Sequence, residues 1–383
     1  MRARTLSAAS LAMSLVVAGI ARATPPLPAE HLDVARLPAQ TPHWAFVYDA
    51  ATNYETDARI YVYDGDKGRL LGQIDAGYYP GFALSADGKT TAVATTYWSR
   101  GWHGTRTDVV EFTDNSTLDF KREVVLPAKR LQGPPNAFNV TYSADQRFLY
   151  VANATPATSF TVVDVAKGSV AGEIETDGCI LAIAAGARRV SSLCESGRLL
   201  TVVLNDDGHE ASRSLSAQFF NADTDPIFVQ GAPNGAQLTF LSFLGDVHGV
   251  DLSGTEPTFA ATWSLVDTAE RGKWRPGGTQ VVAYHARSAR LFVPMHRGGE
   301  GSHKLGGSEI WVFDTDSHKR LARWPVDTRR FGSVISVHVS TDKDPLLFAL
   351  TENSGLIVMD PRTGKIRHVA EKVGQSVWYV VTP

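Results

Sequence analysis

Short apolar strands that end in aspartate recur along the chain. Each copy has five or six residues, is rich in Val, Ile, Phe and Tyr, and is followed by a turn. Aspartate at this position can accept hydrogen bonds from the backbone of the turn, and a following glycine supplies a positive φ. The clearest copies are residues 60–64, 109–114, 160–164, 247–251, 310–314 and 356–360, with 201–205 as a weaker copy that ends in asparagine.

The spacing of these copies predicts a repeat architecture. Their terminal Asp or Asn residues are separated by 50, 50, 41, 46, 63 and 46 residues. A second unit lies between some of them, in which Ser-x-Asp and a polar or glycine residue join two apolar strands as a hairpin, at 82–94, 140–152 and 337–349. Four strands per repeat and seven repeats are typical of a β-propeller. We therefore predict an all-β fold, a seven-bladed β-propeller of four-stranded blades.

Other fold classes fit the pattern less well. A sandwich would not give a period of this length, and a βαβ fold would need amphipathic helices between the strands. The single helix candidate is the segment 265–272, which Ser264 would open, with Asp267 three residues further on as in a loose capping box. It falls in the longest interval between repeats, so we predict that it is a helical insertion.

The two cysteines, Cys179 and Cys194, are placed symmetrically about a turn signal at 186–188. Strands at 180–184 and 190–193 would flank that turn. An antiparallel hairpin then puts the cysteines opposite each other, where a disulfide can form. The alternative is a pair of unrelated buried thiols. Two cysteines exclude a four-cysteine zinc site, and no haem-attachment motif is present.

The N-terminus has the pattern of an export signal. Arg2 and Arg4 precede an uncharged apolar stretch at 6–20, and Ala21-Arg22-Ala23 fits a signal-peptidase site. The stretch is too short and too rich in Ala and Ser to span a membrane, which takes about 20 apolar residues; the alternative is a buried N-terminal helix. We predict a signal peptide at 1–23, a single propeller domain at 24–383, and export to the periplasm, where a disulfide is stable.

Composition and motifs narrow the function classes. The 383 residues carry 37 Lys and Arg against 40 Asp and Glu. The sequence therefore has no excess of basic residues that would indicate nucleic acid as a partner. The chain has no GxSxG, P-loop or HExxH motif. His285, His296 and His303 are spaced unlike any compact metal-ligand motif, so we expect loop hydrogen bonds there and no metal.

Two segments are unusual in combining glycines with charged and aromatic residues. They are 274–280, followed by 283–285, and 295–304. Loops of this kind indicate a surface that contacts a partner or ligand. The alternative is a tightly packed junction between two blades.

These segments resemble the heavy (large) subunit of quinoprotein amine dehydrogenases. The likeness covers essentially the whole mature chain and is greatest to the aromatic (aralkyl) amine dehydrogenase heavy chain, a relative of the methylamine dehydrogenase heavy chain. The segments that carry it are 106–111, 126–130, 153–159, 225–228, 274–278, 283–285, 299–304, 309–314 and the Cys179/Cys194 hairpin.

The resemblance implies a periplasmic α2β2 heterotetramer with a small, disulfide-rich light chain. That light chain would carry the cofactor, tryptophan tryptophylquinone. The enzyme would oxidise primary, here aromatic, amines to aldehyde and ammonia and pass electrons to a cupredoxin of the azurin or amicyanin type. This chain would hold no cofactor and no catalytic residue, would not insert into a membrane, and would act as scaffold and channel wall.

The resemblance also suggests channel residues. The aromatic residue that lines the substrate channel in the family corresponds to Tyr54 here, where the family often has Phe. Tyr97 and Trp98 are further candidates for the wall of that channel. Ordinary core packing is the alternative role for all three. Two other functions remain open at this stage: a free-standing lactonase-like propeller hydrolase with a metal in its central channel, and a periplasmic binding propeller without enzymatic activity.

Overall fold

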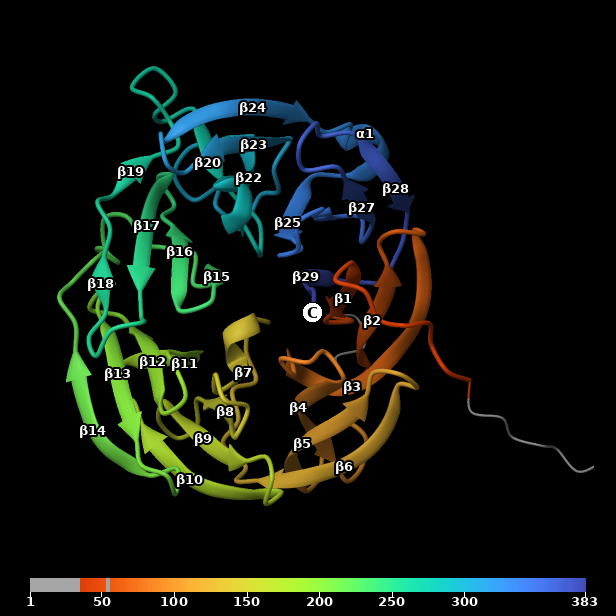
Figure 1. Cartoon of the computed structure of the whole chain (residues 1–383), viewed down its shortest axis with the longest axis vertical. Coiled ribbons are helices and arrows are strands. Elements are labelled where there is room, and N and C mark those ends of the chain that lie inside the picture. The colour runs from red at the N-terminus through yellow and green to blue at the C-terminus, as the bar shows by residue number, and fades with distance from the viewer. Residues whose placement is uncertain (1–34, 53–55) are drawn as a thin grey trace, which may run out of the picture. The chain divides into compact units, whose positions relative to one another are not determined.

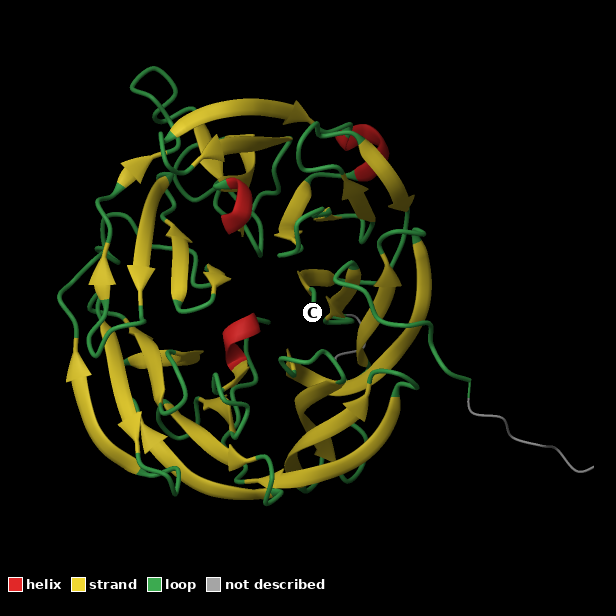
Figure 2. Ribbon diagram, in the orientation of Figure 1, coloured by secondary structure: helices red, strands yellow, loops and turns green. Residues whose placement is uncertain are grey.

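The computed structural model describes residues 35–52 and 56–383. Tyr54 and the predicted export signal with its cleavage site lie outside the described residues. The compact unit runs from Arg36 to Pro383 and consists almost entirely of strands and turns (Figure 2). None of the helices in the described part of the chain has the length and hydrophobicity to cross a membrane.

Antiparallel sheets follow one another along the sequence (Figure 1). The first has seven strands, in the order β29-β1-β2-β3-β4-β5-β6, and the next two have four strands each. The bounds of the seven-stranded sheet are β1 Trp44–Asp49, β2 Ala58–Asp64, β3 Arg69–Leu84, β4 Thr90–Trp98, β5 Arg106–Asp114, β6 Asp119–Leu126 and β29 Val377–Val381. Those of the next two are β7 Val140–Tyr142, β8 Phe148–Asn153, β9 Ser159–Asp164, β10 Ser169–Glu175, β11 Cys179–Ala184, β12 Arg189–Cys194, β13 Leu199–Leu204 and β14 Glu210–Leu215.

Three further sheets complete the described unit, two with five strands and one with four. Their strands are β15 Ala232–Asn234, β16 Gln237–Leu241, β17 Asp246–Asp251, β18 Thr258–Phe259, β19 Trp263–Ser264, β20 Trp274–Pro276, β21 Ala283–His285, β22 Arg290–Arg297, β23 Glu309–Asp314, β24 Lys319–Pro325, β25 Val334–Val339, β26 Leu347–Thr351, β27 Leu356–Met359 and β28 Ile366–Ala370. The described helices are single turns: η1 Ala137–Asn139, η2 Ala286–Ser288 and α1 Thr328–Phe331.

Within the compact unit, neighbouring sheets pack face to face through apolar clusters. One cluster joins Phe148 and Phe160 of the second sheet to Val190 and Val202 of the third. Another joins β1 of the first sheet to β26 and β27 of the last. In Figure 1 the short strands β7, β15, β25 and β29 lie nearest the common centre of the sheets, and β6, β10, β14 and β24 lie at the periphery.

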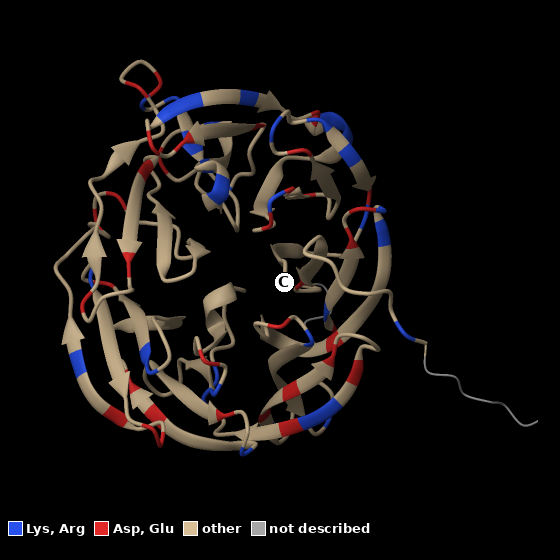
Figure 3. Cartoon of the chain, viewed as in Figure 1, with Lys and Arg blue, Asp and Glu red and all other residues tan. Residues whose placement is uncertain are grey.

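Burial and charge follow this order of strands. The strand β1 is buried throughout, whereas β14 is exposed along almost its whole length. Figure 3 shows charged residues on the peripheral strands β6, β10, β14 and β24, where one face meets solvent. An inner strand with neighbours on both faces must be apolar on both, which explains the uninterrupted hydrophobic runs that end in aspartate.

The aspartate that ends each such strand caps the turn that follows, as predicted. Asp64 accepts hydrogen bonds on Oδ1 from the backbone N–H groups of Asp66 and Lys67, at 3.0 and 3.1 Å. Gly68 then adopts a φ of 62°. Asp164, Lys167 and Gly168 repeat the arrangement in the second sheet.

The prediction of a helix at 265–272 is wrong. Residues 268–273 form turns, in which Asp267 accepts the backbone N–H of Arg271 on its carbonyl and that of Glu270 on its carboxylate. Gly272, with a φ of 84°, ends this local winding, and β20 begins two residues later. A capping residue that is not followed by a long amphipathic segment stabilises a single helical turn only.

Candidate functional site

The segments that carry the family resemblance come together in two places. In an antiparallel sheet with strands in sequence order, alternate connections return to the same edge. The connections β4–β5, β8–β9, β16–β17 and β22–β23 occupy equivalent positions in their sheets. One group of resembling segments gathers beside β4–β5 and β8–β9, and the other beside β16–β17 and β22–β23.

Asp108 is the centre of the first group. It is fully buried and accepts two parallel hydrogen bonds from the Arg106 guanidinium, at 2.8 and 2.7 Å. Its carboxylate also accepts the Thr96 hydroxyl at 2.7 Å and the backbone N–H of Arg130 at 3.1 Å. A buried carboxylate that receives this many donors is fixed in one orientation.

The Arg130 side chain completes this network. It is 3% exposed and donates to the backbone carbonyls of Tyr78, Tyr79 and Leu131 and to the Thr96 hydroxyl. Burial lowers the pKa of Arg130 to about 10, and the nearby Asp108 charge opposes that shift. An isolated bridge also joins Arg130 to Asn153. Three resembling segments, 106–111, 126–130 and 153–159, are thus fixed to one another here.

Tyr97 and Trp98 lie at the end of β4, beside this network. Tyr97 is 41% exposed, and its hydroxyl donates to Glu111 Oε1 at 3.0 Å. Burial, together with the Glu111 charge, raises the pKa of Tyr97, so the phenol is neutral at physiological pH. Successive side chains of a strand point to opposite faces. Tyr97 and Trp98 therefore point to opposite faces of the sheet, and Tyr54 lies outside the described residues.

The second group surrounds a pocket of about 480 Å³. It is lined by residues 223–226, Phe243, Leu244, Arg275 and 299–303. Arg275 belongs to β20 and pairs with His296 of β22 across the ladder. The ring of His303 stacks on Phe243, with centroids 4.1 Å apart and planes 15° apart. The two unusual segments of the sequence and the segment 225–228 thus meet at one hollow.

Next to this pocket, arginines stack over two tryptophans. Arg297 and Arg323 lie over the Trp274 ring at 5.0 and 4.5 Å, and Trp274 lies 5.1 Å from Trp311. Glu309 accepts two hydrogen bonds from Arg323 and one from the Trp311 indole. These contacts stiffen β20 and β23, so that the strand carrying Arg275 is held firmly.

The histidines that we weighed as a metal cluster have separate partners. His285 bonds Ser288 and the Asp342 carbonyl, and His296 bonds Ser302 at 3.0 Å. Burial lowers the pKa of His296 and of His303, and a neighbouring cation adds to the effect in each case. Among the residues that the structure describes, no three His, Cys, Asp or Glu side chains are grouped to hold a metal ion.

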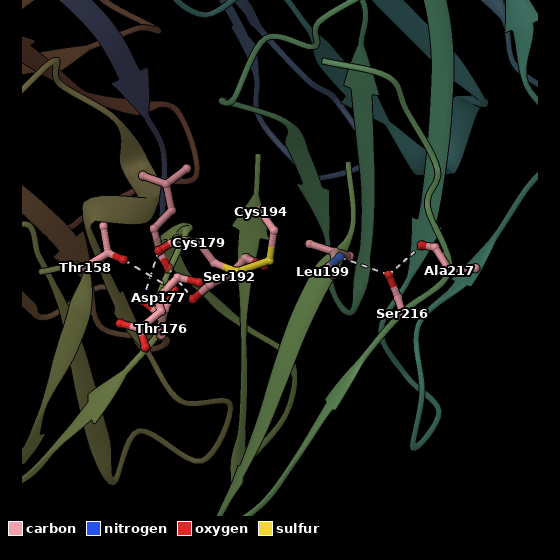
Figure 4. The surroundings of a disulfide bond; sticks show 10 residues. Thr158, Thr176, Asp177, Cys179, Ser192, Cys194, Leu199, Ser216 and Ala217 are labelled. Atoms are coloured by element: carbon pink, nitrogen blue, oxygen red, sulfur yellow. Dashed lines mark hydrogen bonds between the residues drawn. A yellow bond between two sulfur atoms is a disulfide. The ribbon is translucent and has the colours of Figure 1, made fainter. Parts of the chain in front are cut away.

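The predicted cysteine hairpin is present (Figure 4). Cys179 and Cys194 face each other as partners in the pairing of β11 with β12, and they form a disulfide. Both are buried in the cluster that joins the second and third sheets. Thr176 fixes the first cysteine by donating its hydroxyl to the Cys179 carbonyl at 2.9 Å.

Two residues matter more than the sequence alone indicated. Asp108 and Arg275 were each part of a resembling segment, but neither was assigned a role. Their importance depends on burial and on partners 20 or more residues away. A charged residue directly before a pair of buried valines, Asp108 before Val109 and Val110, is a local signal that could have identified the first.

Solved structures of low identity share the fold. A putative 6-phosphogluconolactonase from Bacteroides uniformis superimposes with a TM-score of 0.61 at 12% identity, covering 90% of this chain and 100% of that chain. A second putative 6-phosphogluconolactonase, from Bacteroides fragilis, gives 0.59 at 11% identity, with 90% and 99% covered. At such identities the likeness concerns the fold alone.

Sequence comparison is more specific. The methylamine dehydrogenase heavy chain from Methylorubrum extorquens is 27% identical over 342 residues, which are 88% of this chain and 82% of the relative. The one from Methylophilus methylotrophus is 25% identical over 351 residues, 91% and 85% of the two chains. The family model for the methylamine dehydrogenase heavy chain matches residues 43–382. The chain therefore belongs to the methylamine dehydrogenase heavy chain family.

Proposed function

We propose that this chain is the heavy subunit of a periplasmic amine dehydrogenase that uses tryptophan tryptophylquinone. The observation that carries the proposal is the family match, which spans nearly all of the described unit. A small, disulfide-rich light chain would hold the quinone in an α2β2 assembly, and a cupredoxin of the azurin or amicyanin type would receive the electrons. The substrates would be primary amines, aromatic ones preferred.

In this proposal the heavy chain contributes rigidity and shape. The fold would be a seven-bladed propeller, because the long strand β3 changes partner along its length. Its first part, Arg69 to Gly77, pairs with β2, and Tyr78 to Leu84 pair with β4. The seven-stranded sheet would then count as two blades, and the other five sheets as one each. The pairing of β29 with β1 would close the ring.

The light chain would dock where the segments that carry the family resemblance reach the surface. The β4–β5 connection presents Trp102, which is 77% exposed, and the β22–β23 connection presents Leu305, which is 58% exposed. Exposed large apolar side chains on loops held by a rigid scaffold favour a protein interface. The Asp108 network and the tryptophan–arginine stack would keep these loops in one conformation before binding, which lowers the entropy cost of association.

The deciding experiment separates the two chains. Purified alone, the heavy chain should be colourless and inactive with phenylethylamine and methylamine, because quinone chemistry needs the partner's electrophilic carbonyl. Co-expression with a small cysteine-rich subunit should give a coloured complex that oxidises phenylethylamine faster than methylamine. Amine oxidation by the heavy chain, free of any small subunit by mass spectrometry, would overturn the assignment.

The location has its own test. Export with removal of residues 1–23 predicts that the mature protein begins at Thr24. N-terminal sequencing of the protein from the periplasmic fraction checks this. A mature chain that retains the first 23 residues, or that remains in the cytoplasm, would contradict the periplasmic location but leave the subunit assignment in place.

A further inference from the structure

Arg275 is a buried cation without an acidic partner among the described residues. It is 9% exposed, and within the described protein its guanidinium makes one hydrogen bond, from Nη1 to the neighbouring Trp274 carbonyl at 3.3 Å. Two acids of the neighbouring tryptophan–arginine stack pair with other arginines, since Glu309 binds Arg323 and Glu270 binds Arg320. A guanidinium has five N–H donors, and burying it without an anion is costly. The donors that remain are available to a ligand.

The pocket that Arg275 lines has room for such a ligand. Its volume of about 480 Å³ falls within the range of small-molecule sites. Gly299 and Gly301 form part of its wall, and a Cβ atom added at either would meet nothing within 4 Å. The glycine-rich loop therefore leaves open space at this side of the pocket.

An aromatic wall borders the same space. The stacked pair of Phe243 and His303 lines the pocket, and Phe228 packs against Phe243 from behind at 4.7 Å. Burial and the Lys304 charge lower the pKa of His303, so this ring is neutral at pH 7. The pair therefore offers an apolar, uncharged surface suited to a ring or another apolar group.

The outer part of the pocket has the opposite charge. Asp223 and Glu300 are exposed lining residues, and their carboxylates make no ion pair or hydrogen bond with the described protein. Asp225 is partly committed, because its carboxylate accepts the backbone N–H of Leu244 at 2.9 Å. A ligand that fits would present a negative group to the buried arginine and a positive group to the exposed acids.

We propose that this pocket binds a free amino acid with an apolar or aromatic side chain. The carboxylate would form paired hydrogen bonds with Arg275, the geometry in which a guanidinium binds carboxylates most strongly. The ammonium would face Asp223 and Glu300, and the side chain would pack on Phe243 and His303. All the residues that line the site belong to this chain, so binding to the isolated chain can be measured without the light chain and without amine oxidation.

The test is calorimetric titration of the purified full chain with three related probes. L-phenylalanine should bind. L-phenylalaninamide, which lacks the carboxylate, should bind at least tenfold more weakly, and 3-phenylpropanoate, which lacks the ammonium, several-fold more weakly. This comparison uses the wild-type protein and needs no variant to fold.

Variants then assign the contacts. Arg275→Met should reduce the affinity for phenylalanine at least tenfold. The affinity of Arg275→Lys should lie between those of Arg275→Met and wild type, because lysine keeps the charge but not the paired geometry. Glu300→Gln and Asp223→Asn should weaken the binding of phenylalanine, whereas the binding of 3-phenylpropanoate should stay the same or become tighter. The matched control is Lys273→Gln, which removes an exposed charge two residues from Arg275 that does not line the pocket and should change affinity less than twofold.

Three results would overturn the proposal. One is the absence of binding by L-phenylalanine, and another is equal binding of phenylalanine and its amide. The third is an Arg275→Met protein that is folded by circular dichroism and binds phenylalanine as wild type does.

Discussion

Replacing Asp108 with asparagine should destabilise the fold strongly, although the two side chains have nearly the same shape. The carboxylate is fully buried and holds four donor groups: two N–H groups of Arg106, the Thr96 hydroxyl and the backbone N–H of Arg130. Asparagine removes the charge and puts an N–H₂ group where an acceptor is required. The Arg130 guanidinium, itself buried, then loses its compensating charge.

The size of the effect follows from burial. Removing one partner of a buried ion pair costs about 3–5 kcal/mol. An unfolding entropy of about 2.1 cal/mol/K per residue gives roughly 0.7 kcal/mol/K for residues 36–383. A loss of about 4 kcal/mol therefore lowers the thermal midpoint by about 6 °C, measured by calorimetry on the purified chain at pH 7.5.

The chain contains a matched control for this experiment. Arg59 and Asp57 have the same spacing in sequence and the same double contact, at 3.3 and 2.7 Å, but the Asp57 side chain is 51% exposed. Asp57→Asn should cost less than about 1 kcal/mol, because solvent screens a surface pair. Equal losses in the two variants would refute the argument that burial, and not the contact itself, sets the energy.

Three further predictions concern pH, the disulfide and the channel. Burial lowers the pKa of His338 to about 4 from its ordinary value of 6.5, so the unfolded chain binds a proton at a pH where the folded one does not. The contribution of neutral His338 to stability is therefore fully present above pH 6.5 and is lost as the pH drops from 6.5 towards 4. His338→Gln should reduce this loss of stability in denaturant titrations, and an unchanged pH profile would contradict the prediction. Replacing both Cys179 and Cys194 with serine should cost roughly 3 kcal/mol for the 15-residue separation, visible as a lower denaturation midpoint, whereas thiol titration of denatured, unreduced wild type should find no free thiol. Tyr54→Ala in the active complex should change the preference between phenylethylamine and methylamine more than Tyr97→Phe does; identical kinetics in all three proteins would remove both tyrosines from the channel.

The features predicted from sequence are those whose causes are local. Asp64 bonds N–H groups two and three residues away, so its pattern could be recognised in each repeat. The cysteine hairpin could be predicted for the same reason, since both strands and their turn lie within one short segment. Strand identity followed from runs of apolar residues, which inner strands need on both faces.

The parts that could not be predicted depend on distant partners. Asp108 gains its importance from Arg130 and Thr96, and the Arg275 pocket needs four separate stretches of chain. The predicted helix at 265–272 does not form because a capping aspartate is compatible with a single turn, and Gly272, with a positive φ, is followed two residues later by β20. Local patterns give the strands and turns, but not which charges are buried together.

The pairing of β29 with β1 has a consequence for how the protein is made. Phe46 pairs with Val381, more than 300 residues later in the chain. During synthesis, β1 is present long before the strand that covers its edge, and all of its residues except the terminal Asp49 are apolar or aromatic. An uncovered apolar edge strand is a template for aggregation. Chaperoning of the emerging chain is thus a requirement that this topology imposes, and a protein shortened before Val377 should accumulate as insoluble material even though nearly all of its sheets are intact.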